Sequence, residues 1–476
     1  MSFTEKNKDK LILDQTVKLF EEIEKDLKLD KQIISNVNWW DLVRYPLFID
    51  IKKKIGLQDP DKFSKILKLK KFIFIILRFL KSIFFIFSFK SAIWLKKNCF
   101  IIWGHSRRKF ENGYYIDPYV DPFIELFPSD KDFAVIERDD GNGHYTPAKT
   151  SNLHYADQLL SLAFIFSCFK IVRIDNQQRL IISELEKLIF KKFSCKIDVT
   201  RFIKKKIKRW LGIYPLMCFF FKIKKPKLFF IVVSEEQEAI IAAAKFNKVL
   251  TLELQHGSPA RGKINYDYSS GIKKTNFTDK FLSFGDYWTS DIKLPIKRSE
   301  IIPFGFPYLY KKVHSYSHIV KENRLVVISQ NDNVSNLVNF AKKIKKNFSK
   351  KIIVEYRPHP VELYNDPPGY IQDLLECGVI VSEKHEDLYS IFARSRWQVG
   401  VYSTALYEGL YFDVACFILK LPGHEHMQRL VDLKLAKYIS STKDIDFNFK
   451  VNKKKLSKIF LKPKVTNIYE KFKLGS

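Results

Sequence analysis

This chain of 476 residues lacks the sequence features that mark several large classes of protein. Its six cysteines are scattered with no Cys-x-x-Cys pair, which argues against a zinc-finger type of site and a disulfide framework and fits a reducing compartment. A Gly-rich dinucleotide fingerprint and a Walker loop are absent. Two histidines, His424 and His426, stand close together, but no further ligand cluster accompanies them. We therefore expect no metal site and no cofactor.

Positive charge and aromatic residues are abundant. Lysine and arginine number 82 against 52 acidic residues, giving a formal net charge of +30. This charge predicts attraction to an anionic partner, which is a nucleic acid, an acidic lipid or an acidic glycan. Hydrophobic residues make up 46% of the chain and aromatic residues 15%, enough to bury more than one core. We therefore expect at least two domains.

The periodicity of apolar residues divides the chain into four parts. Residues 1–95 have the pattern of a helical N-terminal extension, facing a membrane or an acceptor. Strand and helix patterns then alternate over 96–305 and again over 306–445, which predicts two Rossmann-like domains. Residues 446–476 are expected to form a helix that packs back across the cleft. The predicted fold class is α/β, with two Rossmann-like domains facing a cleft and an α-helical N-terminal extension.

The first segment with a chemical signature is Gln255-His256-Gly257. Residues 227–233 and 248–254 predict buried strands on either side of a helix over 236–246. His256 then follows the carboxyl end of a strand, where open parallel sheets bind their ligands, and the next residue is a glycine, where a backbone can approach closely. The alternative is a polar residue that serves only the turn.

The second segment is Arg357-Pro358-His359-Pro360, which ends a short strand predicted over 351–356. Its two prolines fix the turn, so Arg357 and His359 can present cationic or hydrogen-bonding groups with little loss of conformational entropy. The alternative is a strand-ending turn with a surface arginine.

The third segment joins a strand over 397–402 to a helix over 405–411. Ser403 and Thr404 fall at the helix N-cap, where hydroxyls and free N–H groups form an anion site. Glu408 lies one turn further on the face of Thr404, within reach of a ribose if a nucleotide phosphate binds at the cap. A plain helix cap and a solvated carboxylate are the alternatives.

In this order the three segments resemble those of bacterial surface-polysaccharide transferases of the GT-B fold. This group includes CDP-glycerol glycerophosphotransferases, Kdo transferases, and sialyl- and polysialyltransferases. Residues 255–259 are similar to the His-Gly-Thr-Pro segment whose histidine is the proposed base of the glycerophosphotransferases. Residues 357–360 resemble the His-Pro motif that meets the donor phosphate, and Ser403-Thr404 resembles the paired hydroxyls that follow it. The resemblance covers residues 225–430.

A fourth segment, Asp139-Asp140-Gly141, is similar to the acidic motif that supplies the base in sialyltransferases, although it lies far from His359 for that family. The base is therefore either His256 or Asp140. Three further polar residues fall in loops of the first Rossmann-like domain, the half that usually faces the acceptor, and are expected to grip an acidic acceptor. They are His105, Arg107 and Arg108. The alternative is that these are ordinary exposed residues.

The resemblance implies an inverting, metal-independent glycosyltransferase of bacterial capsule or surface-polysaccharide synthesis. A nucleotide donor, with CMP-linked Kdo or sialic acid favoured, would give its sugar to a glycan or a lipid-linked glycan. Direct displacement is expected because no nucleophile is placed for a covalent intermediate. Three alternatives stay open: a CDP-glycerol-type glycerophosphotransferase, a sugar-nucleotide 2-epimerase, and a non-catalytic basic protein that binds membrane or nucleic acid. Nucleic acid is not the expected partner.

Two stretches, 72–89 and 200–225, combine apolar residues with lysine and arginine. A spanning helix over 72–89 is disfavoured because Arg78 and Lys81 near its centre would each cost about 2.5–3.5 kcal/mol. The start of the chain also lacks the apolar stretch of a signal peptide. We therefore expect a cytoplasmic protein that binds the anionic inner face of the cytoplasmic membrane. Core helices and solvated charged faces are the alternatives.

Overall fold

The computed structural model describes residues 3–56, 80, 87, 89–105, 108–127, 133–139, 143–260, 262–330, 333–348, 351–359, 362, 369–383 and 386–463. These residues form two compact units. The N-terminal unit is built on Ile12–Phe284 and Trp288–Phe304, and the C-terminal unit on Gly305–Pro463 with residues 3–11 and Gly285–Tyr287.

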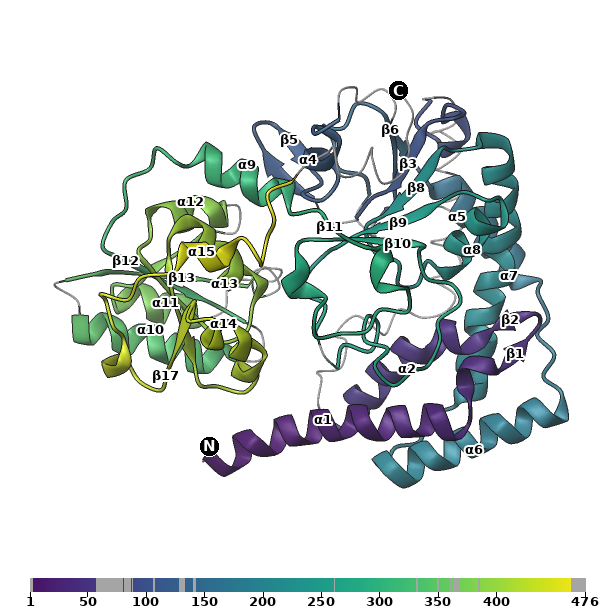
Figure 1. The fold of residues 1–476 in the computed structure, drawn as a ribbon, viewed down its shortest axis with the longest axis horizontal. Coiled ribbons are helices and arrows are strands. Elements are labelled where there is room, and N and C mark those ends of the chain that lie inside the picture. The colour runs from purple at the N-terminus through teal and green to yellow at the C-terminus, as the bar shows by residue number, and fades with distance from the viewer. Residues whose placement is uncertain are drawn as a thin grey trace. The chain divides into compact units, whose positions relative to one another are not determined.

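A seven-stranded sheet in the order β11-β10-β9-β8-β3-β6-β7 forms the centre of the N-terminal unit (Figure 1). All its strand pairs are parallel. From β3 the strands are added first on one side of the sheet and then, from β8, on the other, which is the order of a doubly wound Rossmann-like sheet. The strands are short apolar runs, as expected for a parallel sheet covered on both faces. Their bounds are β3 (Phe100–Trp103), β6 (Phe133–Glu137), β7 (Leu153–Tyr155), β8 (Leu228–Ile231), β9 (Thr251–Leu254), β10 (Lys280–Ser283) and β11 (Ile301–Pro303).

Helices pack on this sheet, and α5, α7 and α8 lie side by side on it in Figure 1. Gly212 lets the backbones of α7 and α5 pack closely, because a Cβ at this position would lie only 2.1 Å from the Ala163 carbonyl oxygen of α5. Among the described residues, the helices of this unit are α1 (Phe3–Asp26, which belongs to it from Ile12 onward), α2 (Trp39–Lys54), α4 (Asp121–Ile124), α5 (Asp157–Cys168), α6 (Asn176–Phe193), α7 (Val199–Lys224) and α8 (Glu238–Phe246). Two short hairpins, β1 (Ile33–Ile34) with β2 (Val37–Asn38) and β4 (Lys109–Glu111) with β5 (Tyr114–Ile116), complete it.

The predicted helical extension is helical in α1 and α2, and both helices contribute to the core of the N-terminal unit. Phe20 and Trp40 belong to the same buried cluster as Ile240 of α8. A buried ion pair joins the two helices, with Arg44 Nε 2.5 Å from a Glu24 carboxylate oxygen. The boundary predicted at residue 95 stays a prediction.

The basic stretch over 200–225 forms helix α7. Its apolar face, which includes Ile207 and Met217, lies in the core, as the core-helix alternative expects. Within the part of the chain that the structure describes, no helix is both long and apolar enough to cross a membrane. Most of the stretch predicted over 72–89 lies outside the described residues. Binding to a membrane surface stays a prediction.

The C-terminal unit contains a six-stranded parallel sheet in the order β14-β13-β12-β15-β16-β17. It is also doubly wound, with its reversal between β12 and β15. The strands are β12 (Arg324–Ile328), β13 (Ile353–Arg357), β14 (Ile380–Val381), β15 (Trp397–Gly400), β16 (Ala415–Leu419) and β17 (Ala436–Ile439). The helices are α9 (Pro307–Ser315), α10 (Val334–Phe348), α11 (Tyr370–Glu376), α12 (Leu388–Arg394), α13 (Thr404–Gly409), α14 (Gln428–Asp432) and α15 (Lys453–Leu456).

The two sheets confirm the predicted α/β class with two Rossmann-like units, which is the composition of the GT-B fold. The cleft between the two domains stays a prediction. The closing helix expected over 446–476 appears among the described residues as the four residues of α15. The chain beyond it, at Phe460, bonds to the Tyr411 hydroxyl of its own unit through its backbone N–H at 2.8 Å.

Candidate active site

His256 lies directly beyond the carboxyl end of β9. The buried Gln255 fixes this turn, because its side-chain amide donates to the Gly257 carbonyl at 2.9 Å and its side-chain oxygen accepts from the Phe284 backbone N–H at 2.7 Å. Gly257 has a φ of 62°, a left-handed conformation that glycine adopts readily. The Gln-His-Gly sequence therefore builds a defined turn that places His256 at the carboxyl edge of the sheet.

Three rings surround the His256 imidazole. The centroid distances are 5.9 Å to His105, 6.4 Å to Tyr119 and 6.2 Å to Tyr266. The Tyr266 hydroxyl lies 3.4 Å from Nδ1 of the imidazole and donates a hydrogen bond to Glu253 at 2.5 Å. The structure thus brings His105, predicted on the acceptor side, next to the predicted base.

Arg108 is buried between two carboxylates. It forms ion pairs with Asp117 and Glu137, each at 2.7 Å, and all three side chains are no more than 3% exposed. Asp117 also accepts hydrogen bonds from the backbone N–H groups of His105 at 3.0 Å and Tyr119 at 2.9 Å. Arg108 therefore helps to fix the loop that carries these two rings. Its predicted contact with an acceptor stays a prediction.

His144 extends this arrangement. Its ring nitrogens lie 2.7 Å from Glu137 and 2.9 Å from Asp157, and the ring stacks on Tyr155 with a centroid distance of 3.5 Å. Burial disfavours the charged ring, but hydrogen bonds to Asp157 and Glu137 outweigh it and raise the pKa of His144 to about 9. His144 is therefore a cation at neutral pH. We call these five side chains the buried ionic network: Arg108, Asp117, Glu137, His144 and Asp157.

Sequence reasoning missed most of this network and the Tyr266–Glu253 pair. A usable signal was present, because Glu137 ends one apolar strand and Glu253 lies inside another, and a charged group in such a strand is unfavourable unless it is paired. Asp140 and Arg107 lie outside the described residues. The choice between His256 and Asp140 as the base therefore stays open.

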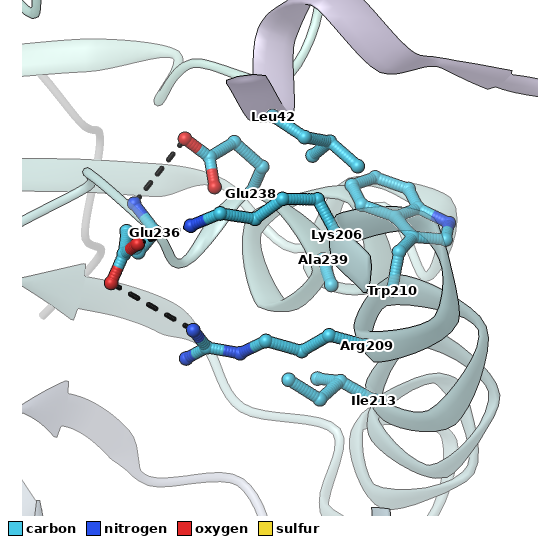
Figure 2. A pocket seen from close by; sticks show the side chains of 8 residues that line it. All are labelled: Leu42, Lys206, Arg209, Trp210, Ile213, Glu236, Glu238 and Ala239. Carbon is cyan, nitrogen blue, oxygen red and sulfur yellow. Dashed lines mark hydrogen bonds and ion pairs between the residues drawn. The ribbon is translucent and has the colours of Figure 1, made fainter. Parts of the chain in front are cut away.

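A small pocket opens where the turn after β8 meets α2, α7 and α8 (Figure 2). Glu236 projects into it from a left-handed backbone position with a φ of 60°. Lys206 forms an ion pair with this carboxylate, and the Arg209 guanidinium lies 3.7 Å from it. The cavity of about 30 Å³ has room for a water-sized group and not for a nucleotide sugar. Lys206 belongs to the basic stretch over 200–225 that is predicted to face a membrane. Its side chain instead forms an ion pair within the N-terminal unit.

In the C-terminal unit, Arg357 is the last residue of β13, at the carboxyl edge of its sheet. Its guanidinium donates to the Glu383 backbone carbonyl at 2.6 Å. Burial holds the pKa of Arg357 below its usual value, partly offset by nearby carboxylates of which Glu386 is the strongest. The side chain is thus a partly desolvated cation, whose attraction for an anion is screened less than it would be in water.

The turn after β13 is fixed by one carboxylate. Glu362 accepts a hydrogen bond from the His359 backbone N–H at 2.8 Å and another from the Ser329 hydroxyl at 2.6 Å. The Tyr356 hydroxyl in turn donates to Ser329 at 2.7 Å. Because Ser329 follows β12, these bonds hold the His359 turn against the neighbouring strand end.

Ser403 is the N-cap of α13, a helix of six residues, and its hydroxyl accepts from the Ala405 backbone N–H at 3.3 Å. The plain helix cap is therefore present, and Thr404 is the first helical residue after it. Glu408 is partly buried, and one of its oxygens accepts from the buried Tyr389 hydroxyl at 2.5 Å. The alternative of a fully solvated Glu408 carboxylate is therefore wrong.

The ends of β12 and β15, on either side of the reversal in strand order, are joined directly. The Tyr402 backbone N–H donates to the Gln330 side-chain oxygen at 3.1 Å. Arg357 ends β13, with His359 in the turn that follows, and Ser403 follows β15. All three thus lie at the carboxyl edge of the same sheet, as predicted. Among the described residues, no group of three or more His, Cys, Asp or Glu side chains is arranged to hold a metal ion.

No protein-family model matches the sequence, and comparison with curated proteins gives no match. Solved structures do resemble it. A UDP-GlcNAc 2-epimerase from Neisseria meningitidis is 11% identical, with 79% of this chain and 90% of that one covered and a TM-score of 0.42. The wall teichoic acid polymerase TagF is 11% identical, with 78% and 86% covered and a TM-score of 0.39. MurG from Acinetobacter baumannii is 10% identical, with 74% and 88% covered and a TM-score of 0.38. At such low scores the fold assignment rests on the two strand orders.

Proposed function

We propose that the protein is an inverting, metal-independent glycosyltransferase of bacterial capsule or surface-polysaccharide synthesis. The observation that carries this proposal is the position of His256, which stands at the carboxyl edge of one Rossmann-like sheet with a tyrosine and a buried carboxylate behind it. A second sheet offers Arg357, His359 and Ser403 at its own carboxyl edge. This is the division of labour that sugar transfer from a nucleotide needs: a base for the acceptor, and cationic and donor groups for the leaving phosphate.

In the proposed reaction, His256 takes the proton from an acceptor hydroxyl. The new bond forms between that oxygen and the anomeric carbon of the donor, while the bond from that carbon to the phosphate oxygen breaks. The nucleotide leaves as an anion that Arg357 and His359, with the hydroxyls of the α13 cap, stabilise. The side chains assigned to the cap and to the donor ribose are Ser403, Thr404 and Glu408.

For the substrates we propose a CMP-linked acidic sugar as donor and a glycan or lipid-linked glycan as acceptor, at the inner face of the cytoplasmic membrane. A thermal-shift panel with CMP, CDP, UDP and GDP tests the donor, because a ligand that binds only the folded state raises its melting temperature. We expect CMP to give the largest rise. Failure of all four nucleotides to stabilise the protein contradicts the proposal.

Product analysis with and without an acceptor then tests the reaction. A transferase needs the acceptor, whereas a sugar-nucleotide 2-epimerase converts the donor alone. A CDP-glycerol donor would leave CMP and a phosphodiester product. We expect acceptor-dependent release of the nucleotide.

A further inference from the structure

A buried carboxylate stands behind the His256 turn. Glu253 lies within β9 between two leucines and is 0% exposed. One of its oxygens, Oε1, accepts hydrogen bonds from the Tyr266 hydroxyl at 2.5 Å and from the Ser234 backbone N–H at 3.3 Å. Its other oxygen, Oε2, has no hydrogen-bond partner among the described residues. A buried carboxylate with so few partners is unfavourable for folding, so a role beyond stability is a reasonable expectation for it.

The direction of the hydrogen bonds fixes the proton positions. A tyrosine hydroxyl has a single proton, and that of Tyr266 goes to Glu253. Toward His256, whose Nδ1 is 3.4 Å away, the hydroxyl can then act only as an acceptor. A hydrogen bond between these two atoms then requires a proton on Nδ1, which in the neutral ring leaves the lone pair on Nε2. The 3.4 Å separation is long, and contacts of this kind tighten when a substrate binds.

We propose that Glu253, acting through Tyr266, is a positioning residue that holds His256 in its Nδ1–H tautomer, makes Nε2 the proton-accepting atom, and stabilises the imidazolium that forms. This inference rests on the proposed role of His256 as the base. The chain of atoms runs from the carboxylate through the phenol to the imidazole, and the negative charge stays on Glu253 while the proton from the acceptor stays on His256.

The loop that carries Tyr266 is held by the helical extension. Arg44 of α2 donates to the Ile264 carbonyl, and its guanidinium lies 4.3 Å from the Tyr268 ring centroid. Arg44 is itself paired with Glu24 of α1. The two helices therefore help to hold the loop that places the Tyr266 hydroxyl next to Glu253. The extension is thus part of the support for the site.

The charges around His256 determine how this chain of groups titrates. Burial raises the pKa of Glu253 to about 7, although hydrogen bonds from Ser234 and Tyr266 oppose the shift, so the charged carboxylate that the proposed arrangement requires is the main form above about pH 7. The other ionisable groups near the chain are His105 and Tyr119 beside the imidazole, Lys274 near Glu253, and Tyr45 and Glu235 near Tyr266.

The test uses the full-length protein with ¹⁵N- and ¹³C-labelled histidine, with the His256→Ala variant to assign the signal. Two variants break the chain of hydrogen bonds, Tyr266→Phe and Glu253→Gln. Tyr268→Phe is the matched control, because it removes a neighbouring buried tyrosine hydroxyl that faces Arg44. If a single variant does not fold, the Glu253→Leu/Tyr266→Phe double variant removes both partners together and avoids an unpaired buried charge.

We expect wild-type His256 to show the Nδ1–H tautomer in long-range ¹H–¹⁵N spectra, and Tyr268→Phe to leave it unchanged. Tyr266→Phe should give a mixture of tautomers, and Glu253→Gln should move the His256 titration midpoint to lower pH by about 0.5–1 unit. A wild-type Nε2–H tautomer, or the same tautomer and titration in all variants, overturns the inference.

The activity arm separates this inference from the proposed function. We expect kcat to fall about 10- to 100-fold in Tyr266→Phe and Glu253→Gln, with the KM for the donor unchanged. If the spectra behave as expected but no transfer to any acceptor occurs, the positioning by Glu253 stands and the function is wrong. If transfer requires His256 but neither variant alters the pH–rate profile, the function stands and the positioning is wrong.

Discussion

The carboxyl edges of the two sheets hold their functional candidates in different ways. In the N-terminal unit, the rings beside His256 are held by buried charges, with Arg108 paired to Asp117 and Glu137. In the C-terminal unit, Arg357 donates to a backbone carbonyl, Ser403 caps a helix, and the His359 turn is held by neutral donors to the single carboxylate of Glu362. Charged partners can tune a proton acceptor, whereas backbone and hydroxyl donors suit a bound anion. The difference supports proton chemistry on one sheet and phosphate binding on the other.

Removal of the proposed base should have the largest effect. His256→Ala should lower kcat by about 10²–10⁴ while nucleotide affinity stays close to that of the wild type, because the imidazole acts on the acceptor. Steady-state kinetics with a nucleotide-binding measurement checks both. Asp140→Ala is the companion variant, and if it alone gives this signature, the base is Asp140.

The opposite edge is tested by Arg357→Ala. Loss of a charge-assisted hydrogen bond of about 1.5–3 kcal/mol should weaken nucleotide binding by about 10- to 100-fold. Arg396→Ala is the matched control, because Arg396 is exposed and precedes β15 at the other edge of the same sheet. Isothermal titration with the preferred nucleotide measures the difference. Equal affinities for the two variants would contradict the assignment of Arg357.

The buried ionic network gives a pH-dependent stability that the C-terminal edge should lack. The pKa of His144 is raised to about 9 in the folded state from its ordinary 6.5. Its pairing therefore stabilises fully below about pH 6.5 and is lost as the pH rises through about 9, with an effect of about 3 kcal/mol.

Urea unfolding between these pH values, followed by fluorescence, tests this prediction. His144→Gln should flatten the pH dependence, because the neutral amide cannot gain or lose the proton. A wild-type stability that does not fall in this range, or a variant with the same fall, would show that the network does not bind the proton as described.

The smallest predicted effect concerns the outer face of α7. Charge reversal at Lys204, Lys205 and Lys208 should weaken binding to anionic vesicles, by up to about 1 kcal/mol per residue, and high salt should weaken it further. Lys206 is left unchanged because it pairs with Glu236. Vesicle flotation measures the effect, and indifference to both changes would assign these lysines to an ordinary solvated face.

The strand ends were predictable from sequence because buried parallel strands are continuous apolar runs. The strand predicted over 248–254 contains β9, that over 397–402 contains β15, and the helix predicted over 405–411 overlaps α13. Since function follows strand ends in such sheets, the positions of His256 and Ser403 followed from the same reasoning.

The partners of these residues could not be predicted in the same way. The hydrogen bond from Tyr266 to Glu253 joins a loop to a strand interior, and the contacts of His144 with Glu137 and Asp157 depend on how three separate segments fold together. Neither has a fixed spacing in the sequence. A buried carboxylate within an apolar strand was the available hint, but such a residue indicates that a partner exists and not which one.

The most direct test of the central claim is a crystal structure with the stabilising nucleotide bound. We expect the phosphate to contact the Arg357–His359 turn and the cap at Ser403–Thr404, with the ribose near Glu408. A nucleotide that contacts only residues before 300 would contradict it.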